Sequence, residues 1–159
     1  MPQAFTPSQH PEWVLLRPDF ALHAPDAMAW AHQLPAESGV YLWTFVTGAT
    51  ESAIYIGKAM SLSRRIYNYA QPFQPHSPND RKLYFAQSAL RSTTPRASFP
   101  LYWKPVPSAA LNETERNAIT ALRPALNDRS RYSQEHRTGL EAAYSALYKE
   151  VIARHFGEA

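Results

Sequence analysis

The sequence has no cysteine among its 159 residues, and this absence excludes three kinds of chemistry. The chain cannot form disulfides, cannot use a thiolate as a nucleophile, and cannot bind a metal ion through sulfur ligands. The absence is also typical of proteins that work in a reducing compartment, so we expect a cytoplasmic location.

Long apolar runs and targeting signals are lacking as well. A membrane-spanning helix needs about 20 consecutive apolar residues, and no stretch of the chain approaches that length. The first residues, MPQAFTPSQHPEW, lack the basic patch followed by an apolar stretch that marks a cleaved signal peptide. The sequence therefore predicts a protein that does not associate with membranes.

The composition is that of a folded domain with a mild excess of positive charge. Hydrophobic residues make up 45% of the chain and charged residues 18%, which is ordinary for a globular protein. The net charge of +3 permits a polyanionic partner but does not by itself indicate one. The histidines show no metal-ligand spacing, so we expect surface or packing roles for all six: His10, His23, His32, His76, His136 and His155.

Fourteen prolines punctuate the chain, and the pattern between them predicts three regions. An N-terminal arm over residues 1–36 contains one helix, which begins near Asp26 and ends before Pro35. A core over residues 37–128 follows. Residues 129–159 form a C-terminal amphipathic helix, which we expect to pack on this core.

An antiparallel hairpin opens the core. Residues 40–46 and 53–56 are rich in β-branched and aromatic side chains, and residues 47–52 between them have the composition of a turn. Each strand carries a glycine and a tyrosine, in Gly39-Val40-Tyr41 and in Tyr55-Ile56-Gly57. Strand tyrosines often only pack against one another across a sheet, so this pair alone does not indicate a site.

The rest of the core predicts three helices and one more strand. Helical periodicity is found over residues 62–69, 81–92 and 108–123, and a strand pattern over residues 98–107. Because prolines lie near both ends of this strand, it should be a short strand or an edge strand. The predicted fold class is α+β, with a small three-stranded antiparallel sheet flanked by helices.

Glu115 is unusual because it lies on the apolar stripe of the last core helix. The stripe is formed by Leu111, Ala118, Ile119 and Leu122. A carboxylate in this position is costly unless a cation compensates it. A capping role, with Asn112 starting the helix, is the alternative, and it weakens if the helix begins near Ser108. Arg65 leaves a similar choice open, since arginines beside a core often only lay their stems along it.

Several motifs, read in order, resemble the GIY-YIG nuclease family. Gly39-Val40-Tyr41 resembles the first motif of this family, and Tyr55-Ile56-Gly57 is identical to its second. The stretch YIGKAMSLSRRI is similar to the segment that follows in the family. It places Arg65 at the arginine position, and Tyr69 comes one helical turn later, where members carry tyrosine or histidine.

The resemblance continues to the end of the core. Glu115 falls at the metal-binding glutamate of the family, and Asn127 at the asparagine that closes its signature. The match covers residues 33–128, and this segment is similar to the nuclease domain of the bacterial excision-repair nucleases. The separation of Tyr41 and Tyr55 is longer than in the repair nucleases, and we expect a longer hairpin loop to accommodate it. The segment before Glu115 is also longer, and we expect target selection there.

The resemblance implies a metal-dependent endonuclease that hydrolyses DNA phosphodiester bonds. Glu115 would bind one divalent cation, Mg²⁺ or alternatively Mn²⁺, and Arg65 would hold the phosphate through a forked pair of hydrogen bonds. Tyr41 would be the general base, provided that a nearby positive charge lowers its pKa. Tyr55 and Tyr69 complete the predicted catalytic residues and would position groups within the site.

Four residues are predicted to support this site: Gly39, Gly57, Lys58 and Asn127. Gly57 would let the substrate backbone approach closely. Lys58 would help to lower the pKa of a tyrosine. Asn127 would fix the end of the helix that carries Glu115.

Basic and aromatic residues alternate over residues 64–104, a composition that suits contacts with DNA. The predicted DNA-binding residues are Arg64, Arg81, Lys82, Arg91, Arg96 and Lys104. A solvated surface with a few buried aromatics is the alternative explanation. Two other functions stay open: a nucleic-acid-binding module that does not cleave, and an interaction protein that dimerises through its C-terminal helix. The sequence does not decide between a monomer and a homodimer.

Overall fold

An antiparallel sheet of four strands organises the protein. The computed structural model describes residues 4–24, 26–71, 78–127 and 142. The strands are β1 (Val14–Arg17), β2 (Gly39–Thr47), β3 (Thr50–Ala59) and β4 (Leu101–Pro105), in the order β1-β4-β2-β3. The predicted α+β class is confirmed, but the sheet has four strands where the sequence predicts three.

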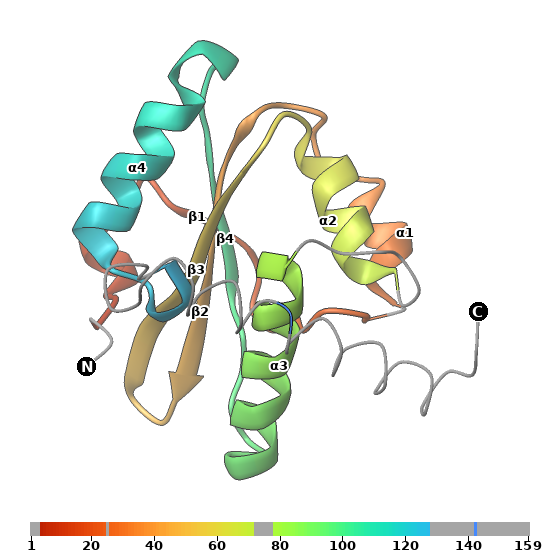
Figure 1. The fold of residues 1–159 in the computed structure, drawn as a ribbon, viewed down its shortest axis with the longest axis vertical. Coiled ribbons are helices and arrows are strands. Elements are labelled where there is room, and N and C mark those ends of the chain that lie inside the picture. The colour runs from red at the N-terminus through yellow and green to blue at the C-terminus, as the bar shows by residue number, and fades with distance from the viewer. Residues whose placement is uncertain (1–3, 25, 72–77, 128–141, 143–159) are drawn as a thin grey trace.

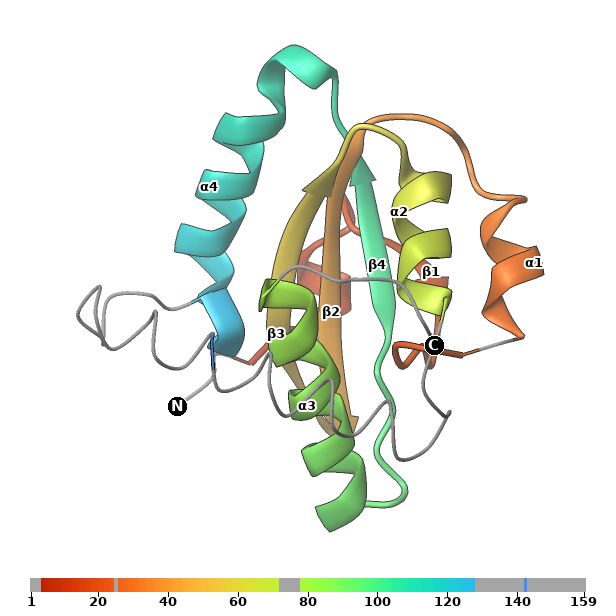
Figure 2. The ribbon, with the colours of Figure 1, turned by 45° about the vertical axis from the view of Figure 1, so that its right-hand side comes forward.

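Helices cover both faces of this sheet. They are α1 (Ala27–Ala31), α2 (Leu62–Ala70), α3 (Pro78–Thr93) and α4 (Leu111–Leu122), with short 3-10 turns η1 (Pro7–Gln9), η2 (Ser108–Ala110) and η3 (Ala125–Asn127). Figures 1 and 2 show α4 on one side of the sheet and α1 with α2 on the other. The C-terminal helix predicted over residues 129–159 lies, apart from Ala142, outside the described residues.

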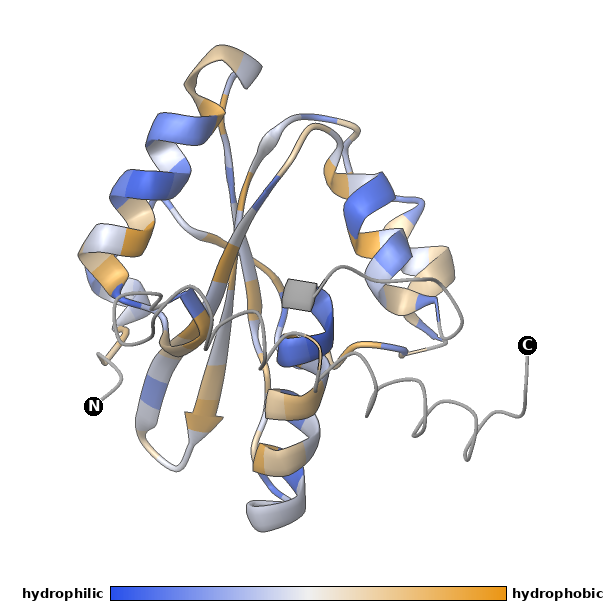
Figure 3. Cartoon of the chain, viewed as in Figure 1, coloured by the Kyte–Doolittle hydropathy of each residue, from blue (hydrophilic) through white to orange (hydrophobic). Residues whose placement is uncertain are grey.

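Successive side chains on a strand point to opposite faces of the sheet, and a hydrophobic core forms on each face. On β2, Tyr41 and Trp43 face the side of α1 and α2, whereas Val40 and Leu42 face the side of α4. Hydrophilic and hydrophobic residues are mixed along both α2 and α4 in Figure 3, as expected for helices that lay one face on a sheet.

The fourth strand corrects the prediction for the N-terminal arm. β1 pairs with β4, and its residues Val14 and Leu15 are about half exposed, at 51% and 49%. A four-residue edge strand without a buried face has no alternating pattern, so the sequence offered no signal for it. The strand predicted over residues 98–107 was expected to be short or to lie at an edge of the sheet. β4 is short, but it is an internal strand, because β1 pairs with its outer side.

The hairpin turn is shorter than the sequence suggests. Thr47 pairs with Thr50, so the turn contains only Gly48 and Ala49, and Gly48 has a φ of +59. The expected longer loop is therefore wrong. Instead, both strands continue up to the two-residue turn. Opposite Trp43 and the residue after it, a β-bulge leaves one residue of β3 without a partner on β2.

Candidate active site

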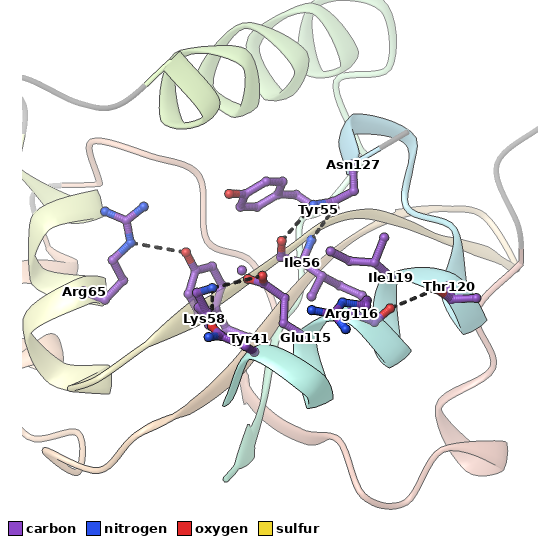
Figure 4. A pocket seen from close by; sticks show the side chains of 12 residues that line it. Tyr41, Tyr55, Ile56, Lys58, Arg65, Glu115, Arg116, Ile119, Thr120 and Asn127 are labelled. Atoms are coloured by element: carbon purple, nitrogen blue, oxygen red, sulfur yellow. Dashed lines mark hydrogen bonds and ion pairs between the residues drawn. The ribbon is translucent and has the colours of Figure 1, made fainter. Parts of the chain in front are cut away.

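A cavity of about 730 Å³ lies at the outer edge of β3. Its lining comes from β2, β3, α2, α4 and η3, and consists of Tyr41, Tyr55, Ile56, Gly57, Lys58, Arg65, Asn112, Glu115, Arg116, Ile119, Thr120 and Asn127. Figure 4 shows these side chains gathered around β3 from both sides. Seven of the nine residues predicted as catalytic or supporting line it, while Tyr69 lies behind it and Gly39 elsewhere.

The two tyrosine motifs meet because of the register of the hairpin. Tyr41 pairs with Gly57, and Trp43 pairs with Tyr55, so both motif tyrosines project from the same face. A Cβ atom on Gly57 would lie 2.3 Å from the hydroxyl oxygen of Tyr41. The glycine therefore makes room for the Tyr41 ring, which corrects the expectation that it makes room for substrate backbone.

Gly39 has a comparable packing role. A Cβ atom there would lie 2.3 Å from the Trp103 ring and 2.5 Å from the Lys104 carbonyl oxygen. The first motif thus needs its glycine for close contact with β4, outside the cavity.

The hydroxyl groups of Tyr41 and Tyr69 form one network with Arg65. The two hydroxyl oxygens are 2.8 Å apart. Arg65 Nε donates to Tyr41 at 3.2 Å, and Arg65 Nη2 donates to Tyr69 at 3.0 Å. The guanidinium also lies over the Tyr69 ring, 4.4 Å from its centroid. The guanidinium of Arg65 is thus held by specific contacts with two tyrosines, and the alternative that Arg65 only packs its aliphatic stem along the core is excluded.

Asp80 joins this network, and the sequence motifs gave no indication of it. Its side chain is 1% exposed, and its Oδ1 accepts a hydrogen bond from Arg65 Nη2 at 2.7 Å. It reaches Arg65 from α3, fifteen residues further along the chain. Such a long-range contact has no local periodicity to reveal it.

Burial raises the pKa of each of the three site tyrosines. Desolvation is the main cause for Tyr41, Tyr55 and Tyr69, and the charge of Arg65 opposes it only in part. The expectation that neighbouring cations lower the pKa of Tyr41 is therefore not met by the protein groups alone. All three phenols are neutral at physiological pH.

Glu115 lines the cavity from α4, whereas Arg65 lines it from α2. Its Oε1 is 3.5 Å from Lys58 Nζ, which also donates to Asn112 Oδ1 at 2.6 Å. Helix α4 begins at Leu111, with Ala110 at the N-cap, so Glu115 belongs to its second turn. The capping explanation based on Asn112 is thereby excluded.

The donor set around Glu115 allows one type of metal site. Among the residues that the structure describes, no group of three or more His, Cys, Asp or Glu could enclose an ion. A single carboxylate with a 23% exposed side chain in an open cavity instead suits an ion that keeps most of its water, as Mg²⁺ does. The nearby Lys58 ammonium would have to share the carboxylate with such an ion.

Asn127 binds the edge of β3. Its Oδ1 accepts from the Ile56 amide at 2.7 Å, and its Nδ2 donates to the Ile56 carbonyl at 3.0 Å. It therefore takes the place of a neighbouring strand at this residue. The helix α4 ends separately, at Arg123 in the left-handed conformation, so Asn127 does not terminate it as expected.

Comparison with known proteins agrees with the motifs. No protein-family model matches the chain. The UvrABC system protein C of Aromatoleum aromaticum is 31% identical over 140 residues, which cover 83% of this chain and 21% of that protein. Two crystal structures of the GIY-YIG N-terminal endonuclease domain of UvrC from Thermotoga maritima, both tyrosine-to-phenylalanine mutants bound to their catalytic divalent cation, have TM-scores of 0.40. They share 23% and 22% identity and cover 65% of this chain and 97% of theirs.

The chain resembles UvrC over most of its length. The resemblance that the motifs predict, to the GIY-YIG nuclease domain of the bacterial excision-repair nucleases, is thereby confirmed. The chain spans only 21% of the length of its curated relative. Among the described residues, no helix is both long and apolar enough to cross a membrane.

The basic residues predicted to bind DNA do not line the GIY-YIG cavity. They lie on α2 (Arg64), on α3 (Arg81, Lys82 and Arg91), in the turn after α3 (Arg96) and on β4 (Lys104). Arg91 pairs with Asp19 at 2.7 Å and lies over the Phe99 ring. The basic residues that do line the cavity are Lys58, Arg65 and Arg116, and the last of these was missed because nothing in its local pattern distinguishes it.

Proposed function

We propose that this protein is a divalent-cation-dependent endonuclease that hydrolyses phosphodiester bonds in DNA. The observation that supports this function is the meeting of Tyr41, Tyr55, Arg65, Lys58 and Glu115 in one open cavity. Phosphodiester hydrolysis needs an oriented nucleophile, positive charge against the developing negative charge, and help for the leaving oxygen. The cavity offers side chains for each need.

The two sides of the cavity have different tasks in this proposal. Arg65 and Tyr55 face the phosphate, Arg65 as a fixed cation and Tyr55 as a neutral phenol that can donate to an oxygen. Glu115 would hold the cation, with Mg²⁺ expected and Mn²⁺ as the alternative. When bound, the cation supplies charge that stabilises a phosphate oxygen and makes a nearby proton easier to remove.

Tyr41 orients the nucleophile in this proposal. Its hydroxyl accepts a hydrogen bond from Arg65 Nε, so its own proton points to Tyr69 or to a ligand in the cavity. A neutral phenol is a poor base, and the general-base role suggested by the resemblance therefore requires Tyr41 to ionise when substrate and cation are bound. Tyr69 completes the network from behind.

The experiment compares the wild-type protein with Glu115→Gln and a matched control, Glu113→Gln, which lies on the same helix but outside the cavity. Supercoiled plasmid, single-stranded DNA and RNA are incubated with Mg²⁺, with Mn²⁺ and with chelator. We expect the wild type and Glu113→Gln to cut DNA only with a divalent cation, and Glu115→Gln to lose cutting while it keeps its fold and its affinity for DNA in chelator.

The opposite outcomes are equally clear. Cutting that persists in excess chelator contradicts the metal dependence. Binding without cutting in every condition favours the non-catalytic nucleic-acid-binding module. A Glu115→Gln protein that is destabilised by up to about 1 kcal/mol yet still active would show that the contact with Lys58 is structural. Cytoplasmic location and oligomeric state stay predictions.

A further inference from the structure

Asp80 lies next to the active-site cavity but outside every motif of the GIY-YIG resemblance. It belongs to the first turn of α3, in the segment between Arg65 and Glu115. Its carboxylate is almost fully buried, and its Oδ1 accepts a hydrogen bond from Arg65 Nη2. Burying a carboxylate costs several kcal/mol unless charge and hydrogen bonds compensate it.

The hydrogen bonds of Arg65 show what Asp80 adds. The single Nε hydrogen is used by Tyr41, and the two Nη2 hydrogens are used by Tyr69 and Asp80. Among the described residues, Nη1 forms no hydrogen bond. The fork formed by Nε and Nη2 is thus committed to the protein, and Nη1 is the nitrogen left for a ligand.

Without Asp80, the contacts that the described residues make with the guanidinium would be those of two neutral hydroxyl groups and the stacking on Tyr69. The two bonds to the tyrosines have one charged partner each, whereas the Arg65–Asp80 pair joins opposite charges, which makes it the stronger attachment. A ligand phosphate would then compete with the two tyrosines for the same fork. The carboxylate opposes this, because it adds a third hydrogen bond that holds the guanidinium at Nη2.

We propose that Asp80 is a positioning residue, which acts through Arg65 to keep the Nε and Nη2 edge on Tyr41 and Tyr69 and to leave Nη1 for the phosphate. This proposal rests on the proposed function. It assigns to the segment between Arg65 and Glu115 a role in assembling the site, and the target selection expected there from the sequence stays a prediction.

A purely structural role for Asp80 makes different predictions. An acidic residue in the first turn of a helix stabilises the helix through its dipole, whatever Arg65 does. Removal of the charge would then lower the melting temperature of the protein and leave the turnover of folded enzyme unchanged. A positioning role lowers kcat with little change in KM, because misplaced catalytic groups slow the reaction more than they weaken binding.

The test uses Asp80→Asn, which keeps the shape and removes the charge, and Asp80→Glu, which keeps the charge. Asp19→Asn is the matched control, since Asp19 forms an ion pair of the same length with Arg91, away from the cavity. For each full-length variant, kcat and KM are measured on a DNA substrate with Mg²⁺. The exchange rate of the Arg65 Nε hydrogen with solvent is followed by nuclear magnetic resonance without DNA or metal.

We expect Asp80→Asn to lower kcat by about tenfold to a hundredfold, to leave KM nearly unchanged, and to speed the exchange of the Arg65 Nε hydrogen. Asp80→Glu should fall between Asp80→Asn and the wild type, and Asp19→Asn should behave like the wild type. In an Arg65→Lys background, Asp80→Asn should have a much smaller effect on kcat, because lysine cannot form the fork.

Three results would overturn the proposal. They are an unchanged Arg65 exchange rate in Asp80→Asn, a loss of melting temperature without a loss of kcat, and an equal loss of kcat in the Arg65→Lys background. If the wild type cuts no DNA, the proposed function fails, and the exchange measurement still decides whether Asp80 holds Arg65. If Asp80→Asn does not fold, the kcat and exchange rate of Asp80→Glu decide in its place.

Discussion

Replacing Gly57 by alanine tests the geometry on which the whole site depends. The new Cβ atom would lie 2.3 Å from the Tyr41 hydroxyl oxygen and 2.4 Å from the ring carbon that bears it. Carbon atoms in ordinary contact are about 3.5–4.0 Å apart. The Tyr41 ring must therefore retreat by more than about 1 Å, and it has little room because it is 1% exposed.

The size of the effect follows from what the ring loses. Overpacking of a well-packed core costs about 1–3 kcal/mol. The hydrogen bonds of Tyr41 with Tyr69 and Arg65 add about 1 kcal/mol each. The smaller loss of backbone entropy for alanine offsets about 0.5–1 kcal/mol. We expect a net destabilisation of about 2–4 kcal/mol, which lowers the melting temperature by roughly 5–15 °C for a domain of this size.

Activity should fall further than stability suggests. A displacement of about 1 Å at a catalytic group can lower the rate by about a hundredfold. The control is Gly48→Ala in the same hairpin, where a Cβ atom meets nothing within 4 Å but the φ of +59 is strained. It should lose about 1 kcal/mol of stability and keep its rate. Thermal unfolding and plasmid nicking on the same preparations separate the two variants. A Gly57→Ala protein with wild-type rate and melting temperature would refute the register-based account.

Three further results are expected. Asn127→Ala should lose about 2 kcal/mol of stability and speed hydrogen exchange at the Ile56 amide, because both edge bonds to Ile56 disappear; an unchanged amide would contradict this. Arg116→Gln should lower the salt dependence of DNA binding in chelator by about one unit of slope, and an equal slope would remove Arg116 from the interface. Since burial raises the pKa of Tyr41 and Tyr69, stability should be complete below about pH 10 and fall as pH rises beyond it; denaturant unfolding at several pH values would contradict this if stability stayed level.

The motif part of the site was predictable because its geometry is local. Once residues 40–56 form a hairpin, the register places Tyr41 opposite Gly57 and on the same face as Tyr55. The helical spacing that follows then brings Arg65 and Tyr69 to one side of α2. Strand and helix periods alone determine these relations, so a pattern of residues can indicate them.

The site residues that the sequence analysis did not predict contact segments that are distant in the chain. Asp80 reaches Arg65 from α3, and Asn112 reaches Lys58 from α4, with no periodicity to mark either contact. The role of Asn127 was mistaken for a similar reason, since its partner Ile56 lies 71 residues earlier in the chain. The six basic residues predicted to bind DNA show the opposite case. They are close together in the sequence, but none of them lines the cavity.

The location of the cavity at the edge of β3 follows from the same contacts. An open sheet edge presents unpaired amide and carbonyl groups and can add a foreign strand. Asn127 pairs with both groups of Ile56, so this part of the edge is closed to a strand. Lys58 on β3 and Arg65 on α2 remain beside it as cations at the cavity. Under the proposed function, this edge, which is closed to backbone but lined with cations, receives the phosphodiester in the cavity that Arg65 on α2 and Glu115 on α4 both line.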